Sequence, residues 1–452
     1  MFELQACDVV AAVDEGDFAG DAAGEASQLD LAISHYEAAL AFYVTQGDQV
    51  AQALTTARIT VQLAGLDRYP EAIRRAEESF QALGEEGDAR ARAQLAVELA
   101  SAYDLSGDPQ AGLLWSERCL ELAGSLEDES LLLQALDQRV FAVFSLGRHA
   151  EALLIARAAA NFADSSAGPL DQAKAVQLLT VCTIADDPKE AVKLSLRCAD
   201  LARRGGRRSV EVISLLNAAE QAIYVAEWST ADRILQGLEG RQLRDSEHAF
   251  RGCCQAILLA LRQDPGQARR QLEEMAPQMG EMLYQSGRLT YVKARAMVAL
   301  TQGELELAQR EARDLVSEEA AGMNSLHALS IQARAALWMR DREGALEVER
   351  RLGSFRGRWA NACALTVSAG LLALGPEGEL ALAAYQKAIS AWREMELPLD
   401  LGLCLLDRVA LQGPDGEGSK EAAREARAIF TEIGSVTLLE KLEQVAPVPI
   451  PA

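Results

Sequence analysis

Aromatic residues are scarce in this chain: they make up 5% of its 452 residues, whereas hydrophobic residues as a whole make up 49%. Strands favour aromatic and β-branched side chains in alternation, and no stretch of the sequence shows that alternation. A chain rich in alanine and poor in aromatics suits helices that pack closely on one another. We therefore predict an all-α protein.

Basic residues are also in short supply. The chain has 44 Lys and Arg against 67 Asp and Glu, a formal net charge of -23, and its first basic residue is Arg58. Phosphate binding requires a basic surface, so we expect no direct nucleic-acid partner. The charge favours a protein or peptide partner that is basic or neutral. The excess of Arg over Lys, together with abundant alanine, suggests a bacterial source.

Signals for secretion and membrane insertion are missing. No basic segment followed by an apolar run stands at Met1, and no apolar run approaches the ~20 residues that span a bilayer. We therefore expect a cytoplasmic protein without a membrane partner. The eight cysteines form no C-x-x-C pair and lie mostly in apolar stretches, as expected of buried thiols in a reducing compartment.

Residues that would support catalysis or metal binding do not gather into motifs. The phosphate loop G-x-x-x-x-G-K-[ST] and the hydrolase motif G-x-S-x-G are absent. The many Asp and Glu residues include no pair whose spacing marks it as a general acid and base. We therefore predict no enzymatic activity, no metal and no cofactor. The adjacent Cys253 and Cys254 are expected in the core. The histidines show no ligand spacing, so we expect each on a helix surface or at a cap: His35, His149, His248 and His327.

An alanine instead recurs every 36 to 41 residues along the chain, just inside a helix-start signal. A period in this range is typical of stacked helical repeats, which present surfaces and rarely carry out chemistry. The recurring residues are Ala32, Ala72, Ala111, Ala152, Ala191, Ala231, Ala268, Ala308, Ala345, Ala381 and Ala422.

Each repeat is predicted to contain two antiparallel helices, the second beginning near the recurring alanine. Small or medium residues follow four and seven positions later, as in Ala191, Ser195 and Cys198, which places them on one helical face. Several of these helices begin with proline in the first turn, and others end with glycine. We expect three regions: a partly loose acidic segment (1–27), the helical array (28–446) and an extended Pro-rich tail (447–452).

Two segments resemble the second helix of a tetratricopeptide (TPR) repeat: "DLAISHYEAALAFY" (30–43) and "GELALAAYQKAISAW" (378–392). In the first, Ala32, Tyr36 and Ala39 match the Ala, Tyr/Phe and Ala positions of that family. The resemblance implies a right-handed superhelical solenoid of about eleven helix pairs. The repeats are longer than the family's usual length of about 34 residues, and most lack its Trp and Leu-Gly signature.

Long degenerate repeats of this kind are similar to the C-terminal arrays of MalT-like (LuxR-type) regulators and of cyclase-associated bacterial signalling proteins. The ending "AREARAIFTEIGSVTLLEKL" (423–442) resembles the way such arrays close. The flanking modules of those regulators are not seen here. The resemblance therefore implies a sensor arm without its output domain, or a free-standing adaptor.

A second recurrence places one polar residue inside the apolar run of each first helix, at intervals of 36 to 40 residues. In TPR arrays the first helices line the concave surface. One hypothesis is a polar ladder that binds a peptide in the groove, and the alternative is hydrogen bonding within the stack. The column comprises Arg58, Glu98, Gln138, Gln177, Asn217, Gln255, Arg295, Gln332, Ser368 and Arg408.

A basic cluster, Arg203, Arg204, Arg207 and Arg208, stands out on so acidic a chain. Guanidinium groups could hold an anion or an acidic partner segment there. The simpler interpretation, which we favour, is a helix C-terminus whose negative end attracts cations.

The function predicted from these patterns is a non-enzymatic module that binds a protein, peptide or effector in a bacterial signalling or regulatory system. Two alternatives remain at this point: a structural adaptor subunit of a larger assembly, or a peptide-pheromone receptor lacking its output domain. The sequence is compatible with an oligomer and does not specify the number of subunits.

Overall fold

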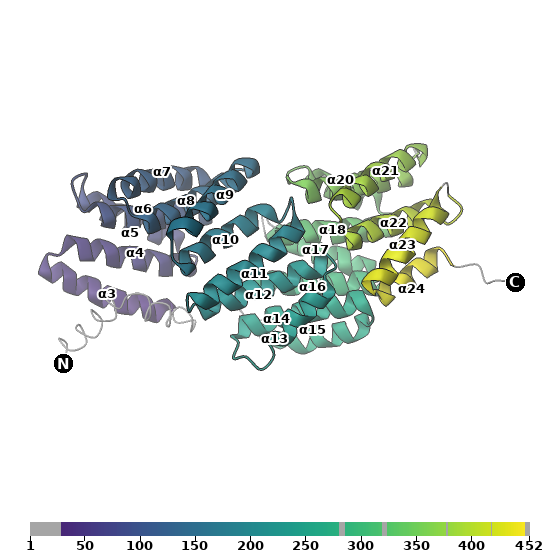
Figure 1. Cartoon of the computed structure of the whole chain (residues 1–452), viewed down its shortest axis with the longest axis horizontal. Helices are drawn as coiled ribbons and strands as arrows, with labels where there is room; N and C mark the ends of the chain where they lie inside the picture. Colours follow the sequence, from purple (N-terminus) through teal and green to yellow (C-terminus); the bar gives the residue numbers. More distant parts are fainter. Residues whose placement is uncertain (1–28, 280–284, 319–322, 377, 417, 448–452) are drawn as a thin grey trace. The chain divides into compact units, whose positions relative to one another are not determined.

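The computed structural model describes residues 29–279, 285–318, 323–376, 378–416 and 418–447. This part of the chain consists of helices joined by short turns and contains no strand (Figure 1), as the sequence predicts. Its contacts divide it into two compact units, the first ending at Cys182 and the second beginning at Thr183.

The described part of unit 1, from Leu29 onward, contains eight helices, of which the last ends one residue beyond the boundary. They are α3 (Leu29–Gln46), α4 (Gln49–Gly65), α5 (Tyr69–Leu83), α6 (Ala89–Leu105), α7 (Pro109–Leu126), α8 (Glu129–Ser145), α9 (His149–Ser166) and α10 (Pro169–Thr183).

Unit 2 contains the remaining helices. They are α11 (Pro188–Arg204), α12 (Arg208–Tyr224), α13 (Trp228–Gly237), α14 (Asp245–Arg262), α15 (Pro265–Met279), α16 (Gln285–Gln302), α17 (Leu305–Glu318), α18 (Met323–Trp338), α19 (Arg342–Leu352), α20 (Arg358–Leu374), α21 (Gly378–Glu394), α22 (Pro398–Gln412), α23 (Ser419–Ile433) and α24 (Val436–Val445).

The recurring alanines fall on the odd-numbered helices, and all but one of them are buried. Ala111 is the exception, because in α7 the buried position is Gly112, followed by Ser116 and Cys119. A Cβ added to Gly112 would lie 3.0 Å from the Ala100 carbonyl oxygen of α6. The repeat is therefore shifted by one residue here, and the closest approach is made by a residue without a side chain.

Six of the turns from even to odd helices share one hydrogen-bond pattern and one backbone conformation. After α6, the N–H of Asp108 donates to the carbonyl of Tyr103 (2.9 Å), and after α12 the N–H of Glu227 donates to Ala222 (2.8 Å). The residue before each donor has a positive φ, which glycine adopts most easily. These residues are Asp67, Gly107, Gly147, Ala226, Gly303 and Arg340.

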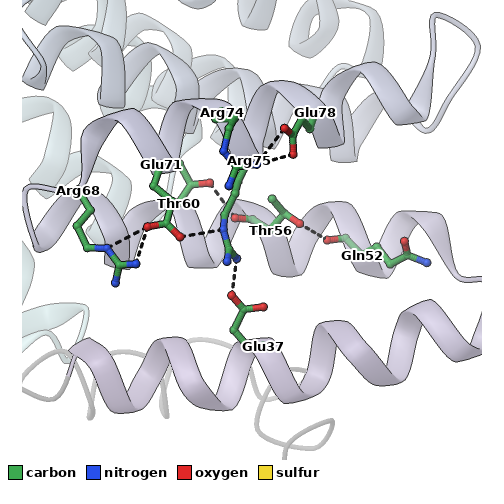
Figure 2. A network of polar contacts seen from close by, with 9 residues as sticks. All are labelled: Glu37, Gln52, Thr56, Thr60, Arg68, Glu71, Arg74, Arg75 and Glu78. Carbon is green, nitrogen blue, oxygen red and sulfur yellow. Dashed lines mark hydrogen bonds and ion pairs between the residues drawn. The ribbon is translucent and has the colours of Figure 1, made fainter.

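Even-numbered helices pack directly on one another, as α4 does on α6 and α12 on α14. Successive odd helices are joined by long polar side chains instead. Figure 2 shows the first such link, in which Arg75 of α5 reaches Glu37 of α3 and also pairs with Glu71. Arg393 of α21 and Glu425 of α23 repeat it at 2.6 Å. The even helices therefore lie on the inner side of each row and the odd helices on the outer side.

The two units differ in their cores. Unit 1 has several small clusters, each formed by neighbouring helices, whereas one continuous cluster runs from α11 to α24 in unit 2. Unit 2 also closes on itself, because Ser435 before α24 donates a hydrogen bond to the Leu261 carbonyl of α14 (2.5 Å). The N–H of Trp359 at the start of α20 donates to the carbonyl of Ala185 (2.9 Å).

Several further predictions can be compared with these helices. The seven cysteines in the described residues are all buried and free, as predicted, and Cys253 and Cys254 lie in the core. None of the described helices combines the length and apolar character needed to cross a membrane. The acidic segment predicted over 1–27 and the tail beyond Pro447 lie outside the described residues.

Candidate functional site

The predicted polar column falls on the inner helices, one residue on each even helix from α4 to α22. Its accessibility varies along the chain. Gln177 and Arg295 are exposed, and Gln332 and Arg408 are buried. The others are half-buried: Arg58, Glu98, Gln138, Asn217, Gln255 and Ser368.

From α16 to α22, three of the four column residues bond within the protein. Arg295 pairs with Glu311 (2.6 Å), Ser368 donates to Glu349, and Arg408 donates to Gln412 (3.1 Å). The Gln332 side chain is 0% exposed, and neither of its amide atoms has a hydrogen-bond partner. Arg408 is thus bonded within the protein, as the internal alternative expects, whereas Gln332 is buried without a partner. Binding of a peptide by the column stays a prediction.

Two charged pairs lie buried in the interior of unit 2. Arg334 of α18 donates to Asp407 of α22 (3.0 Å), which also accepts from the Trp338 indole (2.8 Å). Lys293, which is 0% exposed, pairs with Glu220 (2.7 Å). Such pairs are costly to bury and stabilise the fold only when their geometry is good. These two pairs join α18 to α22 and α12 to α16 through buried charges.

His327 corrects the prediction that each histidine lies on a helix surface or at a cap. It is buried, and its ring stacks on Tyr224 with centroids 3.8 Å apart. Burial lowers the pKa of His327 well below its usual value. Together with Trp359 and Asp400 it lines a cavity of about 10 Å³, roughly the space of one water molecule. Burial raises the pKa of Asp400 to about 6.

The even helices of unit 1 differ, because they expose large apolar side chains. Val61 of α4 is 46% exposed, Phe141 of α8 43% and Val181 of α10 41%. Leu105, the last residue of α6, is 57% exposed. These residues lie three, four or seven positions after the polar column and therefore share its helical face. We call this surface the even-helix face of unit 1: Arg58, Val61, Glu98, Leu105, Gln138, Phe141, Gln177 and Val181.

By contrast, helices α12 to α22 of unit 2 expose no large apolar side chain on their even members within the described residues. The even helices of unit 1 therefore expose large apolar side chains, which the described even helices from α12 to α22 do not.

Three desolvated carboxyl groups lie on the even helices of unit 1. Burial raises the pKa of Asp104 of α6, against a hydrogen bond from Ser145, and the other two are Glu98 and Asp137. Burial raises the pKa of Glu98 to about 7, against the opposing effects of a hydrogen bond from Gln94 (2.8 Å) and the charge of Lys174. Burial also raises the pKa of Asp137 to about 7, and Lys174 again opposes the shift. Asp137 Oδ1 is buried and has no hydrogen-bond partner. Lys174 of α10 is exposed and acts on the carboxyls of Glu98 and Asp137.

Asp137 was not among the predicted site residues, although its place in the repeat is unusual for an acid. Asp137 immediately precedes the column residue Gln138, and the matching residues of α4, α6 and α10 are the buried apolar Ala57, Val97 and Val176. An acid in a core position is unusual, and an unpartnered buried carboxylate calls for a physical or functional reason.

The arginine cluster lies at the α11–α12 turn. Arg203 and Arg204 occupy the last turn of α11, where cations complement the helix dipole, and both lie near Asp200. Arg208 is the first residue of α12 and is exposed. These positions fit the interpretation favoured from the sequence, and binding of an anion there stays a prediction.

A depression of about 310 Å³ between α15, α16 and α17 contains Arg269 and the column residue Arg295. Both guanidinium groups are paired with acids, Arg269 with Glu304 and Arg295 with Glu311. The charge available for an anion is therefore largely neutralised. Among the described residues no three His, Cys, Asp or Glu side chains are grouped so as to hold a metal ion.

Comparison of the sequence with protein families and with curated proteins gives no match. Among solved structures, the chain is similar over 95% of its length to a chain of the APC/C hetero-tetramer Cut9–Hcn1, with 11% identity, 93% of that chain covered and a TM-score of 0.46.

Two further structures are similar. A chain of the Saccharomyces cerevisiae separase–securin complex matches over 98% of this chain and 37% of its own length, with 11% identity and a TM-score of 0.45. Yeast Tom70 matches over 86% of this chain and 93% of its own, with 14% identity and a TM-score of 0.27. These TM-scores are all below 0.5.

Proposed function

We propose that this chain is a non-enzymatic protein-interaction module of the TPR type, which binds a segment of a partner protein on the even-helix face of unit 1. The resemblance to bacterial signalling arrays favours a role in a signalling or regulatory system, with a cytoplasmic location. In this proposal unit 2 is a closed body, and unit 1 carries the recognition surface.

The observation that carries this proposal is the exposure of Val61, Phe141 and Val181 on inner helices of unit 1. Inner helices of such an array normally bury their apolar residues, as α12 to α22 do here. Exposed apolar side chains that recur on one face of neighbouring helices are typical of a surface that a partner covers.

The adaptor alternative is favoured by a separate observation on the outer side. Leu114 of α7 and Leu154 of α9 are 61% and 66% exposed and occupy matching positions of successive repeats. Such a pair could be covered by another subunit. The two surfaces are on different helices, so a single experiment can separate them.

A photo-crosslinking amino acid placed at Phe141 or at Leu154 tests the proposal in the intact chain. Crosslinking to a defined protein from position 141, reduced by Val61→Ser and unaffected by Leu114→Ser, is the expected result. Crosslinks from position 154 alone would contradict the proposal and support the adaptor. The absence of a defined product from position 141 would also contradict it.

A further inference from the structure

Unit 1 carries an uneven share of the negative charge. Residues 29–182 contain 22 Asp and Glu against 11 Lys and Arg, a net charge of -11, although they make up about a third of the chain. The remaining residues from 183 onward contain 38 acids against 33 bases, a net charge of -5. The unit with the open even-helix face is therefore the more acidic one, and its field attracts cations.

Glu98 on this face and Asp137 beside it, next to the face residue Gln138, are placed differently from ordinary surface acids. Glu98 and Asp137 are both only partly accessible, and Asp137 keeps one buried oxygen without a hydrogen-bond partner. Surface acids such as Glu78 and Glu121 are 62% and 70% exposed. A carboxylate that protein atoms have largely desolvated gains more from a cation than an exposed one does, because the local dielectric is lower.

We propose that the even-helix face of unit 1 binds a basic segment of a partner protein, with apolar side chains against Val61, Phe141 and Val181 and an Arg or Lys side chain at Glu98 and Asp137. This inference rests on the proposed function and adds the chemistry of the partner. The charge of Lys174 acts on both acids, so this side chain competes with the partner's cation for them.

The proposal predicts a pH dependence that surface acids would not produce. Glu98 and Asp137 have pKa values of about 7, so both gain charge between pH 6 and pH 8. The groups that act on them are Lys174 and Asp171 of α10, and Cys119 of α7 senses the charge of Glu98. Burial raises the pKa of Cys119 to about 12, so this thiol does not titrate in that range.

The test uses the full chain and labelled peptides of about four helical turns, measured by fluorescence anisotropy at physiological salt. One peptide contains Leu, Ala and Arg, a second has citrulline in place of each Arg, and a third has Ser in place of each Leu. The chain is compared with Glu98→Gln/Asp137→Asn, with Phe141→Ser, and with two matched controls. The controls are Glu78→Gln/Glu121→Gln, which changes the net charge equally, and Leu154→Ser.

The expected result is that the Arg peptide binds more tightly at pH 8 than at pH 6, by about tenfold for each carboxyl that ionises. Glu98→Gln/Asp137→Asn removes this pH dependence and weakens binding at pH 8, and the control pair does neither. Phe141→Ser weakens binding at both pH values, and Leu154→Ser has no effect. Far-UV circular dichroism confirms that each variant is folded.

Two outcomes separate the inference from the proposed function. Equal binding of the Arg and citrulline peptides, lost in Phe141→Ser but kept in Glu98→Gln/Asp137→Asn, would overturn the basic partner and leave the apolar surface in place. Binding that responds to neither Phe141→Ser nor the double variant would overturn both. If the double variant does not fold, the pH dependence of the unmodified chain decides, and its absence would overturn the inference.

Discussion

Glu98 is a residue whose placement costs stability. Its pKa is raised from 4.5 to about 7 by burial, so the folded state holds a proton that the unfolded state releases between these values. The unfolded state is then favoured as the pH rises, and this cost is complete above pH 7. A group that destabilises the fold at neutral pH is a candidate for a binding role.

We predict that Glu98→Gln stabilises the protein at pH 8 by up to about 3 kcal/mol and has little effect near pH 4.5. Glutamine keeps the shape and can still accept the hydrogen bond from Gln94. Urea unfolding at the two pH values measures the difference. The exposed Glu121→Gln serves as the control, and a loss of stability in Glu98→Gln at pH 8 would contradict the prediction.

A substitution at Gln332 can show whether this residue of the polar column stabilises the stack of helices. Its amide is fully buried and has no partner for either atom. Since an unsatisfied buried polar group costs about 1–3 kcal/mol, we expect Gln332→Met to raise the free energy of unfolding by about 1–2 kcal/mol. The exposed Gln177→Met should change it little. Destabilisation by Gln332→Met would show that the amide is satisfied in solution.

At the scale of single elements, the turns between even and odd helices can be compared directly. Gly107 and Ala226 occupy the same position of the same hydrogen-bonded turn, with φ values of 89° and 64°. Alanine is strained in this region, whereas glycine is not. The protein therefore contains the relaxed and the strained form of one turn.

We predict that Ala226→Gly stabilises the protein by about 0.5–1 kcal/mol and that Gly107→Ala destabilises it by about 1 kcal/mol. A Cβ at Gly107 would meet no atom within 4 Å, so the effect there belongs to the backbone alone. Thermal unfolding of the two variants provides the measurement. Effects of the same sign would show that φ does not control these turns.

The helices themselves were predictable from the sequence because their signals are local. The Asp108-Pro109 and Asp187-Pro188 starts, and the small-residue faces of α9 and α11, repeat within each unit and need no distant contact. Gly112 was missed because a shift of one residue leaves the period almost unchanged. The burial of His327 was missed because it depends on Tyr224, about a hundred residues earlier.

At the scale of the whole molecule, the sequence could not predict that α24 packs back on α14 in unit 2. It also could not predict that the even helices of unit 1 expose large apolar side chains. The hydrogen bond from Ser435 to the Leu261 carbonyl joins residues 174 positions apart, and no periodic pattern encodes such a contact. The predicted column residues therefore share a position in the repeat but not an environment. Gln177 of α10 is exposed, whereas Gln332 of α18 is buried.

Because α24 packs on α14 in unit 2, a destabilising change at one helix should weaken distant helices of that unit as well. In unit 1 such a change should act mainly on neighbouring helices. Leu442 of α24 is 0% exposed and belongs to the core that runs from α11 to α24, whereas Leu63 of α4 is 1% exposed and packs within a small cluster of α3 to α6. Each Leu→Ala change should cost about 2–5 kcal/mol, since it leaves a cavity.

We predict that Leu442→Ala speeds hydrogen exchange in α14 and α22 as well as in α24, because those helices lose the element that covers them. Leu63→Ala should speed exchange in α3 to α6 and leave α8 and α9 protected, since rows of locally packed helices lose stability mainly near the change. Exchange measured by mass spectrometry resolves both patterns in the full chain. If Leu442→Ala affected α24 alone, the closing contact would contribute little to the stability of unit 2, and its inner side would be as free to open as that of unit 1.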